Sequence, residues 1–160
     1  MCCTSCCFIV IIRHGISLFE AINYRELFMN QSHTIEKNLL KQVIVVEGDS
    51  SLRRSMVNHL MLDGYTVTGV GSAYDFYRQV FEEPYALAII DSDLFDQNGL
   101  VVAEYARKNT IMRIITLSDP LSSTTVPAKI KAGADINLVK PVDFRLLAAC
   151  VTTLFSRISL

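Results

Sequence analysis

Five apolar residues, Ala86-Leu87-Ala88-Ile89-Ile90, run directly into the acidic segment Asp91-Ser92-Asp93. A run this short and apolar on both faces is typical of a parallel strand that helices cover on each side. Four further short apolar runs accompany it, at residues 43–46, 65–70, 111–117 and 136–139. The sequence therefore predicts five strands, and Asp91 and Asp93 follow the end of the third predicted strand.

Amphipathic segments separate these runs. They are residues 52–62, 72–81, 100–108, 127–132 and 144–156. Ser72, with Asp75 three residues later, resembles a capping box and marks a helix start. Pro127 is tolerated only in a first turn, so the fourth helix should be short. Alternating strands and helices predict a doubly wound α/β fold, a parallel sheet with helices on both faces.

Composition limits the class of protein. The chain has 160 residues, of which 51% are apolar and 19% charged, and this excludes a disordered chain. Fifteen basic against 16 acidic residues leave a net charge of −1, so no direct nucleic acid binding is expected. No apolar stretch is long enough to span a membrane. Cysteines cluster at the start and form no disulfide framework, which favours a cytoplasmic location.

The predicted strands begin at residue 43, which divides the chain into two parts. Residues 1–42 are interpreted as an N-terminal extension that is partly helical or disordered, and residues 43–160 as a single domain. Cys3-Thr4-Ser5-Cys6 has C-x-x-C spacing, but one such pair lacks the further ligands of a closed zinc site.

Acidic side chains gather where the predicted strands end. Six of the 13 acids in residues 43–160 lie there: Glu47, Asp49, Asp91, Asp93, Asp96 and Asp119. Carboxyl ends of parallel strands are where such sheets bind ligands. Carboxylates brought together there repel one another unless a cation offsets them, and their oxygens suit Mg²⁺. A solvated acidic rim without a ligand is the alternative.

Four segments, in this order, resemble the receiver domain of two-component response regulators. They are Val43-Ile44-Val45-Val46-Glu47-Gly48-Asp49, Ile89-Ile90-Asp91-Ser92-Asp93-Leu94 with Gly99, Thr116-Leu117-Ser118, and Gly133-Ala134-Asp135 leading into Val139-Lys140-Pro141. The resemblance covers residues 43–157. It implies a flavodoxin-like sheet of strand order 2-1-3-4-5, and a phosphoryl-accepting signalling module rather than an enzyme.

The resemblance also implies roles for three residues. Asp91 matches the aspartate that attacks a phosphohistidine and forms an acyl phosphate. Lys140 matches the lysine that contacts the phosphoryl group as a point charge, and Ser118 the hydroxyl that hydrogen-bonds a phosphoryl oxygen. The implied partner is a sensor histidine kinase or a phosphotransfer protein. A homodimer and a C-terminal effector domain outside this sequence are further candidates.

The implied cofactor is Mg²⁺. Its ligands would be Glu47, Asp91 and the backbone carbonyl of Asp93, with Asp49 as a candidate replacement ligand. Gly48 stands where the family usually has a second acid, so weak Mg²⁺ binding is expected.

Three further positions depart from the family pattern: Phe95 replaces a proline, Asp119 a small residue, and Asn137 an aromatic residue. Gly48, Asp119 and Asn137 motivate a second hypothesis, a phosphorylation-independent pseudo-receiver that acts as a protein-interaction module. A third, a small flavin-binding protein, is disfavoured because the strand ends offer carboxylates where a flavin phosphate needs hydroxyl and N–H groups.

Overall fold

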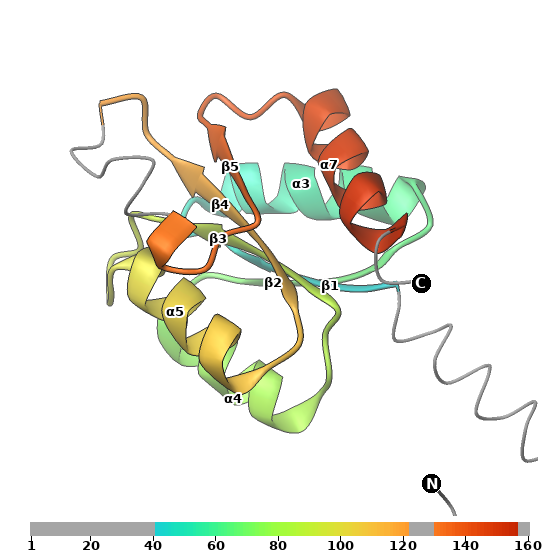
Figure 1. Ribbon diagram of the computed structural model, residues 1–160. Helices are drawn as coiled ribbons and strands as arrows, with labels where there is room; N and C mark the ends of the chain where they lie inside the picture. The colour runs from blue at the N-terminus through green and yellow to red at the C-terminus, as the bar shows by residue number, and fades with distance from the viewer. Residues whose placement is uncertain (1–40, 122–129, 157–160) are drawn as a thin grey trace, which may run out of the picture. The chain divides into compact units, whose positions relative to one another are not determined.

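The computed structural model describes residues 41–121 and 130–156. Within them the elements are β1 (Gln42–Val46), α3 (Ser50–Leu62), β2 (Thr66–Val70), α4 (Ala73–Glu82), β3 (Leu87–Asp91), α5 (Gly99–Asn109), β4 (Arg113–Ser118), β5 (Ile136–Val139) and α7 (Phe144–Ser156). The strands form one parallel sheet in the order β2-β1-β3-β4-β5 (Figure 1). The expected fold and strand order are confirmed.

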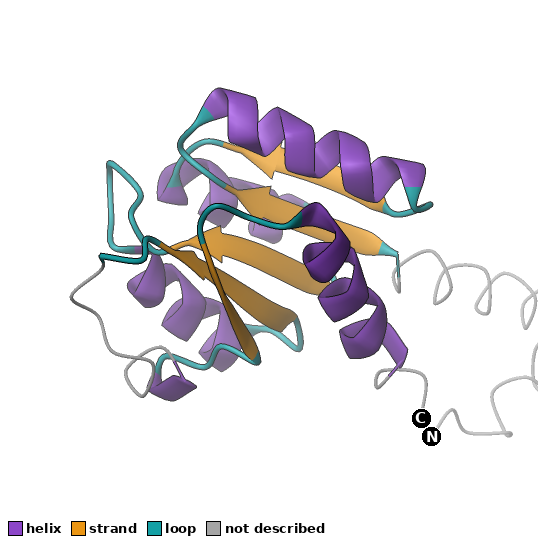
Figure 2. Cartoon of the chain, turned by 90° about the horizontal axis from the view of Figure 1, so that it is seen from above, coloured by secondary structure: helices purple, strands orange, loops and turns teal. Residues whose placement is uncertain are grey.

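Each face of the sheet has its own apolar core, because successive side chains of a strand point to opposite faces. Val43 and Val45 of β1 pack in one cluster with residues of α3 and α7. Ile44 and Val46 of the same strand pack in the other with residues of α4 and α5. Figure 1 shows these two pairs of helices on opposite sides of the sheet, and Figure 2 shows the strands lying side by side between them.

Strand β5 and helix α7 have the expected bounds, and hydrogen bonds set several other boundaries, which differ from the expected ones by one or two residues. Helix α3 begins at Ser50 because Asp49 Oδ1 accepts hydrogen bonds from the N–H groups of Ser51 and Leu52, at 2.7 and 3.0 Å. Strand β2 begins after Tyr65, since the Tyr65 N–H donates to Leu60 O and closes the end of α3. The expected cap of α4 is confirmed: Ser72 Oγ accepts from Asp75 N.

Three sequence predictions meet different outcomes. Strand β4 begins two residues later than expected, at Arg113, and Ile111 is 91% exposed. The expected helix at 127–132 and the extension at 1–42 lie largely outside the described residues. None of the described helices is long and apolar enough to cross a membrane.

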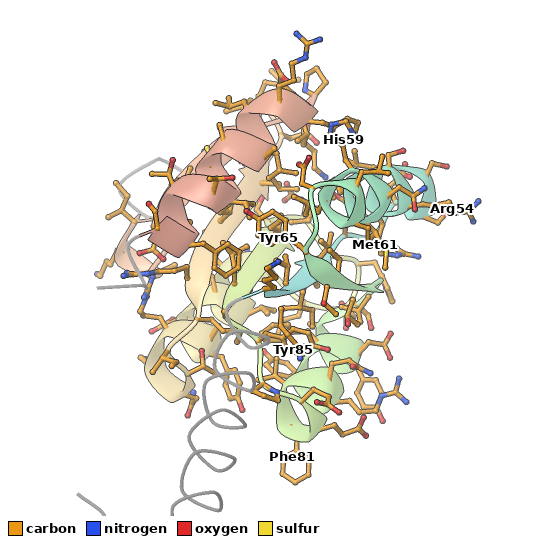
Figure 3. All side chains as sticks on the ribbon, turned by 90° about the vertical axis from the view of Figure 1, so that its right-hand side faces the viewer. Arg54, His59, Met61, Tyr65, Phe81 and Tyr85 are labelled. Carbon is orange, nitrogen blue, oxygen red and sulfur yellow. The ribbon has the colours of Figure 1, made fainter. Side chains whose placement is uncertain are left out.

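Surface side chains of α3 and α4 differ in what they contact. Arg54 and Phe81 point away from the sheet (Figure 3). His59, also exposed, lies against Phe144 of α7 with ring centroids 5.2 Å apart. Tyr85, which precedes β3, is buried, and its hydroxyl oxygen lies within hydrogen-bond distance of Gln79 Oε1 and Thr68 Oγ1, at 3.1 and 3.2 Å. Arg54 is exposed like His59, and neither takes part in the cores of the sheet.

Candidate functional site at the carboxyl ends of the strands

Three charged side chains from different strands converge at one edge of the sheet. Asp91 is the last residue of β3, Glu47 follows β1, and Lys140 follows β5. Lys140 Nζ lies 2.9 Å from Glu47 Oε2 and 2.9 Å from Asp91 Oδ2. The side chains are 2% (Glu47), 5% (Asp91) and 19% (Lys140) exposed. Two buried carboxylates therefore share one ammonium group.

Backbone hydrogen bonds of the loop after β3 position Asp91. Asp93 N donates to Asp91 Oδ1 at 3.2 Å, and Gly99 N donates to Ser92 O at 2.9 Å. A Cβ atom on Gly99 would lie 1.8 Å from the backbone oxygen of Asp91, closer than any real contact. Only glycine therefore allows the start of α5 to pass this close to Asp91.

Burial and charge act in opposite directions on these groups. Burial is the largest influence on Glu47 and raises its pKa, although Lys140 and the Asp49 N–H partly offset it. Burial lowers the pKa of Lys140, but its hydrogen bonds to Asp91 and Glu47 outweigh that influence and the pKa is raised. The lysine is thus held in its charged form by two acids.

The oxygen donors at this edge suit a hard cation. Apart from its ion pair with Lys140, Glu47 Oε2 accepts no hydrogen bond although it is buried. Carboxylate oxygens such as those of Glu47 and Asp91 are the kind of ligand that Mg²⁺ takes when it also keeps several waters, so the chemistry of these residues fits this ion. Within residues 41–121 and 130–156 there is no group of three or more acidic, histidine or cysteine side chains that could hold a metal.

Gly48 and Asp49 explain why the carboxylate set is small. A Cβ on Gly48 would meet no atom within 4 Å, so the position has room for a side chain but supplies none. Asp49 is exposed, and Oδ1 is used in capping α3, which lowers the pKa of this carboxyl group through hydrogen bonds from Leu52 and Ser51. Its role as a metal ligand stays a prediction.

Ser118, at the end of β4, is fully buried and lies in this region of the sheet. Its backbone oxygen accepts from Lys140 N at 2.9 Å. Its hydroxyl donates to Asn137 Oδ1 at 3.3 Å. Asp119, the next residue, is exposed. The predicted hydroxyl is therefore present, and its partner is the residue that replaces the aromatic of the family.

Two contacts at this edge were not foreseen from the sequence. Arg53 of α3 donates from Nη1 to the backbone oxygen of Glu47 at 2.5 Å. Asp96 accepts hydrogen bonds from Ala73 N and Tyr74 N at 3.1 and 3.0 Å, and so caps α4 from the loop after β3. An arginine one turn into a helix gives no local signal of such a contact, and the Asp96 contact joins residues more than 20 positions apart.

A family model described as "Response regulator receiver domain" matches residues 43–152, more than half of the chain. The chain belongs to the response regulator receiver family. The fold and the order of the strand ends found above agree with this membership, and receiver domains are signalling modules rather than classical enzymes.

Curated relatives are longer proteins. The regulatory protein VirG of Rhizobium rhizogenes is 28% identical over 107 residues, which cover 66% of this receiver chain and 44% of VirG. The TorCAD operon transcriptional regulatory protein TorR of Escherichia coli O157:H7 is 25% identical over 118 residues, which cover 74% of this chain and 51% of TorR. The chain thus spans about half the length of these relatives.

Solved structures give the same fold. The CheY-like response regulator receiver domain protein of Methanospirillum hungatei JF-1 is 26% identical and has a TM-score of 0.69. The match covers 73% of this chain and 94% of that protein's chain. The receiver domain of the TMAO respiratory system response regulator TorR, at 24% identity and a TM-score of 0.69, shares the fold.

Proposed function

We propose that Asp91 accepts a phosphoryl group from a histidine kinase or a phosphotransfer protein. The observation that carries the proposal is the buried Asp91 carboxylate at the end of β3, with Lys140 Nζ 2.9 Å from its Oδ2. A carboxylate oxygen would attack the phosphorus of a phosphohistidine, forming a P–O bond as the P–N bond breaks. The bonding electrons leave with the imidazole, which takes a proton from solvent.

Each neighbouring group has a function in this reaction. The Lys140 ammonium, held charged by two acids, would contact a phosphoryl oxygen and stabilise the added negative charge. Glu47, Asp91 and the Asp93 carbonyl would hold Mg²⁺. When bound, Mg²⁺ supplies neutralisation of charge on the phosphoryl oxygens. The Ser118 hydroxyl would donate to one of those oxygens.

The test is an intact-mass measurement after incubation with a small phosphodonor, such as acetyl phosphate, and Mg²⁺. Wild-type protein should gain the mass of one phosphoryl group, and Asp91→Asn should gain none. Asp96→Asn is the matched control, because this acid lies in the same loop but is exposed and occupied by backbone N–H groups. A gain that persists in Asp91→Asn would contradict the assignment.

Gly48 favours a second candidate, a pseudo-receiver that binds its partner without phosphorylation. The missing acid leaves two carboxylates, those of Glu47 and Asp91, in ion pairs with Lys140 among the described residues. This candidate predicts no mass gain at any Mg²⁺ concentration, whereas Gly48→Asp restores the gain. The same measurement therefore separates the two functions.

We further propose that residues 43–160 act as one receiver unit, on a partner protein or an effector domain. The support is the match over residues 43–152 and the greater length of the curated relatives. Homodimer formation and an N-terminal extension over residues 1–42 remain proposals of the same kind.

A further inference from the structure

Asn137 of β5 joins two buried hydroxyl groups of β4. In the parallel pairing of the two strands, Asn137 is the register partner of Thr116. Thr116 Oγ1 donates to Asn137 Oδ1 at 3.1 Å, and Ser118 Oγ donates to the same oxygen at 3.3 Å. Thr116 and Ser118 are both fully buried. One partly buried amide oxygen therefore accepts two hydrogen bonds from buried hydroxyl groups.

The Ser118 hydrogen bond conflicts with the reaction proposed for Asp91. A serine hydroxyl carries one hydrogen and donates it to one acceptor at a time. Here that hydrogen is directed to Asn137. When Asp91 carries a phosphoryl group, a phosphoryl oxygen becomes a second acceptor for it. Asn137 and the phosphoryl group must therefore compete for the Ser118 hydroxyl.

Release of Ser118 would cost one hydrogen bond but would leave the Asn137 amide oxygen with a donor. Its Oδ1 would keep the hydrogen bond from Thr116, which is the shorter of the two. No acceptor would become unsatisfied, so the largest penalty of breaking a partly buried hydrogen bond does not arise. A charged phosphoryl oxygen is also a stronger acceptor than a neutral amide oxygen. Both effects favour transfer of the hydroxyl to the phosphoryl group.

We infer that Asn137 is a positioning residue that keeps the Ser118 hydroxyl on β5 in the unphosphorylated protein and releases it to a phosphoryl group on Asp91. The inference rests on the proposed function of Asp91. Thr116 is needed as well, because its hydroxyl continues to donate a hydrogen bond to the Asn137 amide oxygen after the Ser118 hydroxyl has been released. An aromatic or aliphatic side chain at position 137 lacks this acceptor.

The first experiment tests the contact in protein without a phosphoryl group. The NMR resonances of the Asn137 side-chain amide are compared in wild type, Ser118→Ala and Thr116→Val. Each substitution removes one donor, so both should shift these resonances, whereas Ser156→Ala on α7 should not. Unchanged resonances in Ser118→Ala would overturn the inference.

The second experiment measures the competition as an equilibrium. Beryllium fluoride serves as the phosphoryl analogue, with Mg²⁺, and its dissociation constant is measured by ¹⁹F NMR. Asn137→Leu removes the competing acceptor and should tighten binding by about threefold to tenfold, the usual worth of one hydrogen bond. Thr116→Val should weaken binding by a similar factor, because release would then leave the amide oxygen unsatisfied. A merely structural role predicts no such opposite signs.

A double-mutant comparison completes the test. In the Ser118→Ala background, Asn137→Leu should leave the dissociation constant unchanged, since no hydroxyl remains to be contested. An equal effect in both backgrounds would overturn the inference. If wild-type protein takes up neither beryllium fluoride nor a phosphoryl group, the proposed function and the release step fail together. If it takes up both and the Asn137 effects are absent, only the inference fails.

Discussion

Two groups of charged side chains lie at opposite ends of the sheet, and they are built in opposite ways. At the carboxyl ends, the acids Glu47 and Asp91 share Lys140, and all three side chains are at most 19% exposed. At the amino ends, the single acid Asp135 lies 2.5 Å from Arg107 Nη2 and 3.5 Å from Arg113 Nη1. One group has two acids for one base, and the other has two bases for one acid.

The difference supports the proposal that the carboxyl ends, rather than the amino ends, accept the phosphoryl group. Asp135 also accepts a hydrogen bond from Ile114 N at 2.8 Å, and its arginines are 36% and 34% exposed, so water offsets their excess charge. The acids around Lys140 are buried and short of positive charge. A further cation should therefore be stabilising there, and the balanced composition of the whole chain conceals this local shortage.

The largest effect should come from removing the shared base. Lys140→Met leaves two buried acids without a counter-charge and should lower the free energy of unfolding by about 3 kcal/mol, measured by urea denaturation. Added Mg²⁺ should restore part of this loss. A loss below about 1 kcal/mol, the value for exposed ion pairs, would show that the two ends of the sheet do not differ.

Adding an acid should sharpen the contrast. Gly48→Asp places a carboxylate where a side chain meets no neighbour, and it should tighten Mg²⁺ binding by about tenfold through added charge. The measurement is the rise of the melting temperature with Mg²⁺ concentration. Gly48→Asn is the matched control, because it has the same shape without the charge. Equal Mg²⁺ affinity in both variants would contradict the prediction.

The group at the amino ends should respond weakly. Asp135→Asn keeps an acceptor for Ile114 N and removes a charge from partly exposed arginines, so a loss of about 1 kcal/mol in the free energy of unfolding is expected. The gain of phosphoryl mass should not change. A loss as large as that of Lys140→Met would contradict the prediction, because it would show that the two groups do not differ in what they contribute to stability.

The smallest effect is expected for Asp96, an exposed acid at the carboxyl ends of the strands, and it tests whether this position alone makes an acid important. Burial raises the pKa of Asp96, but hydrogen bonds from backbone N–H groups, including those of Ala73 and Tyr74, outweigh it and lower the pKa below its usual 3.8. The ionised form therefore contributes stability above pH 3.8, and this is lost as the pH falls through the lowered pKa. Asp96→Asn should cost about 0.5 kcal/mol at neutral pH, because the group is exposed.

The pH series supplies the control for this last variant. The difference in unfolding free energy between wild type and Asp96→Asn should shrink in acid, where the wild-type carboxyl group is itself protonated. A difference that stays constant with pH would show that Asp96 does not act through its charge. Phosphoryl uptake should be unchanged, in contrast to Asp91→Asn.

The positions of Asp91, Glu47 and Lys140 at one edge could be predicted because every strand of a parallel sheet ends on the same side. Their convergence on one lysine nitrogen could not, since it depends on side-chain conformations chosen by packing. Asp49 shows the limit clearly: by spacing it is a candidate ligand, and the fold uses one of its oxygens to cap α3.

By itself, the sequence determined the alternation of buried strands and amphipathic helices, and with it the edge where the acids gather, because hydrophobic periodicity and chain order are local properties. The tertiary structure alone decided that Asp96 caps α4 and that Asn137 accepts the hydroxyls of Thr116 and Ser118. These contacts join residues about 20 positions apart. A hydrogen bond depends on separations of a few tenths of an ångström, and only the packed sheet sets those.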